Sequence, residues 1–297
     1  MMKVSGVSQI AWWGVALMSA LVLSGCAGNP KTHKNQASQG IEAEAASSPS
    51  LETLRAYAES GDIGAQFDLG LSLAESNAKD AVKWLESAAM QGFGAAAYEL
   101  GQLQDDPKRA VEWYSMAAAM DHVGAKFELG NAYMHGRGTA KEPAWGLMWY
   151  ERAARAGRAD AQFAMGEVMA GTAVGPAQPD EALVWLLIAD QNKHADAAAL
   201  IEAVKTRLPP ELIGTAEQRA AAWTDQPASS GVHDRAVLRF AQYALNRLGY
   251  DVGPADGLSG DRTETAIAAF RAKEGIGGDG LNGRVLDLLR ERVSVLN

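Results

Sequence analysis

The sequence predicts an all-α protein, in which a solenoid of repeated helix pairs is followed by a small module of three helices. Three observations lead to this fold class. A short motif occurs four times in the middle of the chain, a tryptophan follows each copy, and the chain after residue 233 has a different pattern that is rich in glycine. Tandem repeats of this kind are typical of solenoids, because each unit buries its apolar face only against its neighbours.

The repeated motif begins with alanine and ends with glycine. Its copies are Ala65–Gly70, Ala96–Gly101, Ala125–Gly130 and Ala161–Gly166, and the tryptophans that follow are Trp84, Trp113, Trp149 and Trp185. The spacing from each tryptophan to the alanine position of the next repeat is constant, whereas the spacing from motif glycine to tryptophan varies. All length variation falls in one loop, so each repeat is predicted to be a pair of helices.

The repeat register also predicts which side chains are buried. We expect the four tryptophans in the core between repeats, because large aromatic side chains at a regular position are most often core residues. Four acidic residues of the repeats are expected on the solvated face, and these are Glu99, Glu112, Glu128 and Glu151. Trp145 is out of register, in a repeat that already contains Trp149. It is therefore predicted to be partly exposed, on a face that binds a protein partner.

Proline and glycine mark the expected helix ends. Pro107, Pro143 and Pro179 stand at the same distance before the tryptophans of the second, third and fourth repeats. Proline is tolerated in the first turn of a helix, so the second helices of these repeats are predicted to begin there. Gly92 and Gly157 stand where such helices would end in a left-handed turn. Residues 51–62 fit half of a preceding repeat, and residues 195–223 fit a terminal cap.

The repeats resemble Sel1-like repeats, which are relatives of the tetratricopeptide repeat. The third and fourth copies, at 125–160 and 161–196, are equal in length and have the full length of that family. Tyr133-Met-His-Gly136-Arg-Gly138 matches its Tyr-x-x-Gly-x-Gly loop. The first two copies, at 65–95 and 96–124, are shorter and lack this loop. The resemblance covers residues 51–223 and implies an α-solenoid that binds protein partners.

The last part of the chain, residues 234–297, is predicted to be a separate three-helix domain after a linker at residues 224–233. Helical spacing covers residues 236–248 and 263–270, with Ile267 and Phe270 inward and Asp261 as the expected cap, and a last helix is expected from about Arg284. The pattern resembles the type 1 peptidoglycan-binding domain. The matching residues are Gln242, Leu245, Gly249, Tyr250, Asp256, Gly257, Gly260, Thr263, Ala266, Phe270, Asp279 and Gly280.

The resemblance implies that this domain binds peptidoglycan. The candidate ligand contacts are Tyr250, Asp256, Gly257, Gly260, Arg262, Thr263 and Phe270. Most of the matched residues also have a structural explanation, since glycines permit tight loops and Asp256 can cap backbone N–H groups. The chain departs from the family pattern at Arg271, and at Val285 and Leu286.

Residues 1–25 have the outline of a secretory signal, with Lys3 before an apolar stretch from Ile10 to Leu23. The tetrad Leu23-Ser24-Gly25-Cys26 resembles the lipobox of bacterial lipoproteins. This resemblance implies cleavage before Cys26, acylation of Cys26 and anchoring in a membrane. Ala27 favours the outer membrane, with the protein facing the periplasm. The alternative is an uncleaved membrane helix, although the apolar stretch is short for a span.

Composition narrows the classes of function further. Residues 26–50 are polar and small, and are predicted to be a disordered tether. Cys26 is the only cysteine, so no disulfide framework is expected. The formal net charge is −9, which argues against binding to nucleic acid through bulk charge.

The chain lacks the residues that enzymes acting on cell walls use for catalysis. A cross-linking transpeptidase needs a nucleophilic cysteine near a histidine, and the only cysteine is assigned to the lipid. The five histidines are scattered, so no metal site is predicted. Three Glu-Ser pairs lack the surroundings of lytic transglycosylases, and these are Glu59-Ser60, Glu75-Ser76 and Glu86-Ser87. We therefore expect no enzyme, no catalytic residue and no cofactor.

The prediction is a lipid-anchored scaffold whose partners are peptidoglycan, envelope proteins on the repeats and the membrane through Cys26. One alternative is an accessory or regulatory subunit of an envelope enzyme or assembly, with wall binding secondary. A cell-wall hydrolase is a further alternative with less support.

Overall fold

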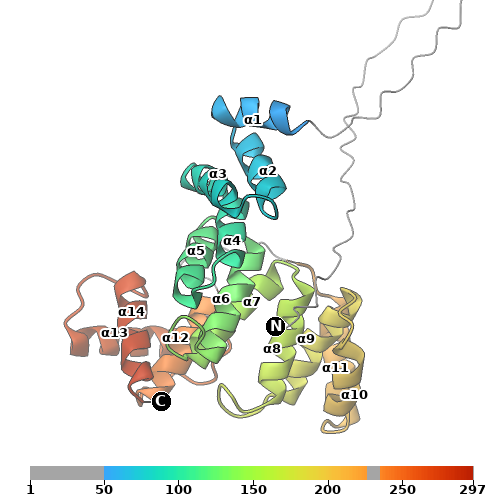
Figure 1. Cartoon of the computed structure of the whole chain (residues 1–297). Helices are drawn as coiled ribbons and strands as arrows, with labels where there is room; N and C mark the ends of the chain where they lie inside the picture. The colour runs from blue at the N-terminus through green and yellow to red at the C-terminus, as the bar shows by residue number, and fades with distance from the viewer. Residues whose placement is uncertain (1–49, 226–234, 297) are drawn as a thin grey trace, which may run out of the picture. The chain divides into compact units, whose positions relative to one another are not determined.

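The computed structural model describes residues 50–225 and 235–296 (Figure 1). The predicted signal peptide, the acylated Cys26, almost all of the tether and most of the linker lie outside these residues. The described residues belong to one compact unit. Their regular secondary structure is entirely α-helical, which confirms the predicted all-α class. Every helix in this part of the chain is too short or too polar to cross a bilayer.

Each of the four repeats is a pair of helices, as predicted. A single helix, α1 (Leu51–Glu59), precedes them. The pairs are α2 (Ile63–Leu73) with α3 (Ala78–Met90), α4 (Gly94–Gln102) with α5 (Pro107–Ala119), α6 (Val123–His135) with α7 (Pro143–Arg155), and α8 (Ala159–Ala170) with α9 (Pro179–Gln191). Helices α10 (Ala197–Lys205) and α11 (Pro210–Ala221) pack on α9. Successive helices lie side by side along the stack (Figure 1).

Three of the second helices begin at the prolines that the sequence singled out, Pro107, Pro143 and Pro179. In the first turn of a helix the backbone nitrogen has no intrahelical acceptor, so the missing N–H of proline has no cost there.

The turn after each second helix contains one residue with a left-handed backbone, at the same distance after the tryptophan in every repeat. Gly92 and Gly157 hold this position with φ of +92° and +89°, as predicted. In the other two repeats the position is held by Asp121 and Lys193, with φ of +66° and +64°. Residues with a Cβ are strained in this conformation, so the sequence signal for the turn is absent there although the turn is the same.

The motif glycine allows the two helices of a repeat to approach closely. A Cβ on Gly130 would lie 2.3 Å from the ring of Tyr150, and one on Gly166 would lie 2.5 Å from Leu186. The same relation holds in the other repeats, where Gly70 faces Leu85 and Gly101 faces Tyr114. In every repeat the residue that fills this space directly follows the tryptophan.

The prediction that all four tryptophans are core residues is therefore wrong for three of them. Trp185 is 2% exposed, but Trp84, Trp113 and Trp149 are only partly buried. The buried aromatic or leucine is the next residue, because it shares a helical face with the alanines three and four positions later. Trp185 is covered because Trp223 packs against it, with ring centroids 4.9 Å apart.

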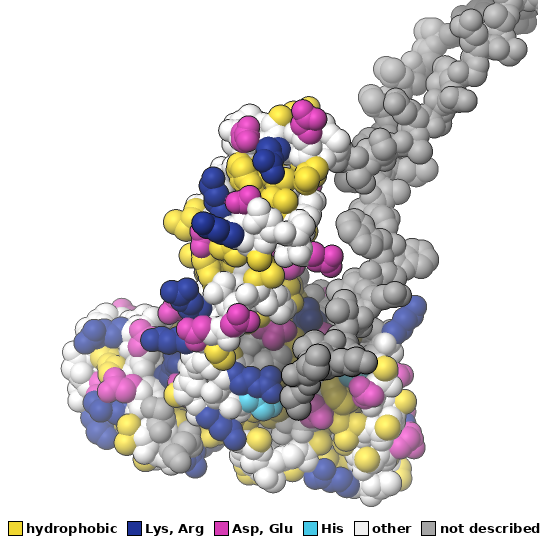
Figure 2. Space-filling view, in the orientation of Figure 1, with side chains coloured by type: hydrophobic (Ala, Val, Ile, Leu, Met, Phe, Trp, Pro, Cys, Tyr) yellow, Lys and Arg dark blue, Asp and Glu magenta, His cyan; other side chains and the backbone are white. Residues whose placement is uncertain are grey.

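The three remaining helices, α12 (Arg235–Arg247), α13 (Asp261–Glu274) and α14 (Gly283–Ser294), surround a core that also includes Met148 of α7. Ile267 and Phe270 are buried in it, as predicted. The expected capping role of Asp261 is wrong, because the N-cap position of α13 is Gly260 and Asp261 is the first helical residue. The surface over these helices carries side chains of both charges (Figure 2).

Candidate functional site

The long loop between α12 and α13 is held by one buried glutamine. The amide nitrogen of Gln242 donates hydrogen bonds to Leu258 O at 2.9 Å, and to Asp256 Oδ1 and Thr263 Oγ1 at 3.1 Å each. Its amide oxygen accepts the Gly257 N–H at 2.7 Å. One side chain on α12 therefore fixes both the loop and the start of α13.

Asp256 is the second organising residue of this loop. Its Oδ1 accepts the N–H of Leu258 at 2.9 Å, as expected of a capping aspartate. Burial raises the pKa of the Asp256 carboxyl, but the hydrogen bonds from Leu258 and Gln242 and the charge of Arg235 outweigh this effect and hold the pKa below its usual value. Asp256 is therefore an ionised part of the loop scaffold.

The candidate ligand contacts divide into buried and accessible residues. Thr263 and Phe270 are each 2% exposed, and Gly257 is buried against the backbone of Arg235. These residues, with Asp256, shape the loop from within, and contact of Thr263 and Phe270 with a ligand stays a prediction. Tyr250, Gly260 and Arg262 remain accessible. The ring of Tyr250 packs edge-on to Phe270, with ring centroids 6.1 Å apart.

The accessible residues Tyr250 and Arg262 line one shallow groove on the C-terminal domain, with a volume of about 330 Å³. Asp251 and Asp261 also line it, and Arg262 forms an ion pair with Asp251. An aromatic ring, a guanidinium and two carboxylates can contact a sugar face, a carboxylate and an ammonium group respectively. The groove therefore has the side chains to bind a glycan that carries short charged peptides.

Trp145 lies against the C-terminal domain. Its ring packs edge-on to Phe240 of α12, with centroids 4.7 Å apart, and the Arg290 guanidinium of α14 lies 5.2 Å from its centre. Arg290 also donates to both carboxylate oxygens of Glu142, one bond measuring 2.7 Å. The role of Trp145 in binding another protein stays a prediction, and helices of the same chain contact its ring in this structure.

The prediction that Glu151 lies on the solvated face is wrong. Glu151 is 0% exposed and is held between two arginines. Arg155 Nε donates to Glu151 Oε1 at 3.0 Å, and Arg239 Nε of α12 lies 3.0 Å from Glu151 Oε2. Burying a carboxylate is costly unless it is paired, and here one partner of the pair comes from the C-terminal domain.

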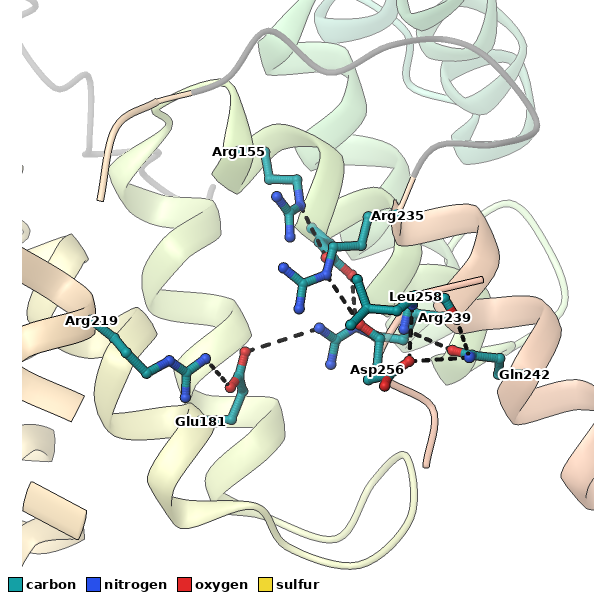
Figure 3. A network of polar contacts seen from close by, with 10 residues as sticks. Arg155, Glu181, Arg219, Arg235, Arg239, Gln242, Asp256 and Leu258 are labelled. Carbon is teal, nitrogen blue, oxygen red and sulfur yellow. Dashed lines mark hydrogen bonds and ion pairs between the residues drawn. The ribbon is translucent and has the colours of Figure 1, made fainter. Parts of the chain in front are cut away.

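The same network reaches the fourth repeat (Figure 3). Arg239 Nη2 lies 3.9 Å from Glu181 Oε1, and Arg219 Nη2 donates to Glu181 Oε2 at 2.6 Å. Arg235 Nε donates to the Asp256 carbonyl at 3.1 Å. Of the residues in this network, the sequence pattern predicts only Asp256 as a site residue, because none of the arginines belongs to a motif.

Metal-ligating side chains are dispersed in the described ranges. No group of three His, Cys, Asp or Glu residues there is placed to hold a metal ion.

Comparisons with known protein families match both parts of the chain. The Sel1 repeat model matches residues 64–93, 94–122, 123–157 and 159–189. The peptidoglycan binding domain model matches residues 235–284. A comparison with curated proteins finds no match to this chain.

Two solved structures are similar to a little over half of this chain. One is a protective antigen present in uropathogenic Escherichia coli strains that displays an SLR fold, with 27% identity, a TM-score of 0.54 and coverage of 57% of this chain. This chain spans only 39% of the length of that protein. The other is a Sel1 repeat protein from Oxalobacter formigenes, with 27% identity, a TM-score of 0.49 and coverage of 57% of this chain and 76% of that one. The chain thus contains Sel1 repeats within residues 64–189 and a peptidoglycan binding domain at residues 235–284.

Proposed function

We propose that this protein is a non-catalytic scaffold of the bacterial cell envelope, which binds peptidoglycan through its C-terminal domain and protein partners through its repeats. The observation that carries this function is the presence of both domain types on one chain. Acylation of Cys26 would hold the scaffold in the outer membrane, facing the periplasm. Wall binding at one end and a lipid at the other would restrict where the partners of the repeats assemble.

The geometry of the C-terminal domain supports wall binding. The Gln242 hydrogen bonds hold the loop in one conformation, and Tyr250 and Arg262 lie accessible beside it. A site that is ordered before binding loses less conformational entropy when the ligand arrives.

Exposed apolar side chains on α1 and on the first repeat support protein binding. Large apolar side chains are exposed on α1, α2 and α3, where yellow surface gathers in Figure 2. They include Tyr57, Leu71 and Met90, which are 58%, 41% and 74% exposed. Exposed apolar groups close together are typical of surfaces that bind other proteins.

The test of wall binding is co-sedimentation of the purified protein with peptidoglycan sacculi. Arg262→Ala and Tyr250→Ala should each reduce the sedimented fraction, because they remove groove side chains. The Tyr250 ring also packs against Phe270, so thermal unfolding is used to show that the Tyr250→Ala protein is folded. Arg284→Ala is the matched control, an exposed arginine on α14 that does not line the groove. Equal sedimentation of all three variants and the native protein would show that this groove does not bind the wall.

The lipid anchor has its own test. Cells that express the chain are labelled with a radioactive fatty acid, and Cys26→Ser is compared with the native sequence. Label in the native protein and none in the variant is the expected result. Equal label in both would refute acylation of Cys26.

A further inference from the structure

A second groove lies between the fourth repeat and the C-terminal domain. Its volume of about 760 Å³ is larger than that of the shallow groove lined by Tyr250 and Arg262. One wall is a face of α12, and the opposite wall is the loop between α8 and α9 together with Glu181. The floor includes the loop from Gly253 to Asp256. Volumes of this order are typical of clefts that hold small ligands.

Arginines dominate the charged lining of this groove. Arg235, Arg239 and Arg247 are spaced at whole multiples of four positions and therefore share one face of α12. Tyr243 lies on the same face. This places an aromatic ring between guanidinium groups, along the length of the groove.

The carboxylates of the groove are already engaged. Glu181 accepts a hydrogen bond from Arg219 at 2.6 Å, and Asp256 accepts from Leu258 N–H and from Gln242. Glu151, behind the groove, is occupied by Arg155 and Arg239. Each of these three carboxylates therefore already has a partner within the protein.

Positive charge is in excess in the network around the groove. The network holds four guanidinium groups, those of Arg155, Arg219, Arg235 and Arg239, and three carboxylates, those of Glu151, Glu181 and Asp256. Figure 3 shows the guanidinium groups of Arg155, Arg235 and Arg239 in one column, with Glu181 facing them from α9. Burial, together with the charges of Arg155 and Arg239, lowers the pKa of Arg235 below its usual value.

Arg235 lines the groove and has hydrogen-bonding groups that no described residue is shown to occupy. Within the described residues its side chain makes one hydrogen bond, from Nε to the Asp256 carbonyl at 3.1 Å. Its two terminal nitrogens are therefore available to an acceptor in the groove. A guanidinium with two such nitrogens matches the two oxygens of a carboxylate.

We propose that this groove binds a carboxylate-bearing peptide stem of peptidoglycan, with Arg235 as the anchor of the carboxylate and Tyr243 beside the stem. The assignment rests on the proposed function, since the wall is the ligand of the domain that supplies α12. It adds that the fourth repeat takes part in recognition, so the two domains bind the wall together. A bound carboxylate would also relieve the repulsion among the arginines.

The test measures binding of a soluble disaccharide–tetrapeptide from peptidoglycan to the purified protein by calorimetry. The same compound with its carboxyl groups converted to amides is the comparison ligand. We expect the amide form to bind about tenfold more weakly, because it cannot form charge-assisted hydrogen bonds. Arg235→Gln should weaken binding of the acid form to a similar extent and leave binding of the amide form unchanged. Arg284→Gln, outside the groove, should bind both forms as the native protein does.

A second pair of variants tests the wall of the groove that comes from the repeats. Ala173 is exposed in the loop between α8 and α9 and lines the groove. Ala173→Glu adds a competing carboxylate, whereas Ala173→Gln adds nearly the same volume without charge. The acid form should bind more weakly to the Glu variant than to the Gln variant, and thermal unfolding should show both variants to be folded.

The outcomes separate this inference from the proposed function. If Arg235→Gln binds the acid form as tightly as the native protein, or if the native protein does not distinguish acid from amide, the inference is wrong even where sacculi still retain the protein. If sacculi do not retain the native protein, the proposed function itself fails. An acidic peptide of ordinary L-residues that binds more tightly than the wall fragment, and loses affinity in Arg235→Gln, would overturn the assignment to peptidoglycan.

Discussion

Arg239 of the C-terminal domain lies with its Nε 3.0 Å from Oε2 of Glu151, which belongs to the third repeat and is completely buried. The two residues are far apart in the sequence. Their contact joins the parts of the chain that match two different families. The repeats and the C-terminal domain therefore depend on each other for the pairing of buried charges.

This relation predicts a large effect of Glu151→Ala on stability. The variant leaves Arg155 and Arg239 buried without their carboxylate, and removing one partner of a buried ion pair costs about 3–5 kcal/mol. Urea unfolding followed by circular dichroism would measure the loss. Glu86→Ala is the matched control, because Glu86 stands two positions after Trp84 as Glu151 stands two positions after Trp149, yet Glu86 is exposed. A loss below about 1 kcal/mol for Glu151→Ala, no larger than a typical surface effect, would contradict the buried pair.

The motif glycines predict a second measurable effect. In Gly130→Ala the new Cβ would lie 2.3 Å from the Tyr150 ring, which cannot easily move because Tyr150 Oη donates to Asn131 Oδ1 at 2.7 Å. Overpacking of this kind costs about 1–3 kcal/mol. In Gly214→Ala, within α11, the Cβ would meet open space among the described residues. That control should gain up to about 1 kcal/mol of stability from the better helix propensity of alanine. Similar melting temperatures for the two variants would exclude a special role for the motif glycine.

Local signals in the sequence predicted local structure well. The three prolines before the tryptophans begin their helices, and Gly92 and Gly157 adopt the left-handed turn. These features depend on backbone geometry at the residue itself. The repeat length and motif therefore give the helix pairs without knowledge of tertiary contacts.

Burial was predicted less well, because it depends on distant parts of the chain. Glu86 and Glu151 have the same residue type and the same register, yet one is exposed and the other is buried by α12. Trp145 is partly exposed, as predicted, but its contact with Phe240 of α12 was not predicted. No pattern within the repeats indicates that a later domain packs on the third repeat. The arginines of the larger groove were missed because no motif contains them.

The turn at Lys193 offers a stabilising substitution. Lys193 has φ of +64° at the position where other repeats have glycine. Left-handed backbone costs a residue with a Cβ about 1–2 kcal/mol relative to glycine. Lys193→Gly should therefore raise the free energy of unfolding by about 1 kcal/mol. The reciprocal change, Gly92→Ala, introduces a Cβ that meets open space among the described residues, so its expected loss of about 1 kcal/mol would come from the backbone alone. Opposite signs for the two variants are required for this explanation.

His122 makes the third repeat sensitive to mild acid. Its Nδ1 accepts the N–H of Ala125 at 3.2 Å and so caps α6, and its ring lies on Tyr98 with centroids 4.5 Å apart. Burial lowers the pKa of the His122 imidazole, and the charges of Arg158 and Lys126 lower it further. The folded state therefore favours the neutral ring, which is the form that can accept the hydrogen bond.

The direction of the pH effect follows from the lowered pKa. The unfolded chain takes up a proton on His122 at its ordinary pKa of about 6.5, before the folded chain does, so the contribution to stability is complete above that pH and decreases as the pH falls below it. His122→Asn keeps an acceptor at the N-cap, as Asp62 does for Ala65 in the first repeat, but removes the titrating ring. Native and variant proteins should have similar unfolding free energies at pH 8. Between pH 7 and pH 5 the native protein should lose more stability than the variant. Parallel loss in both proteins across this range would show that His122 is not the group that titrates.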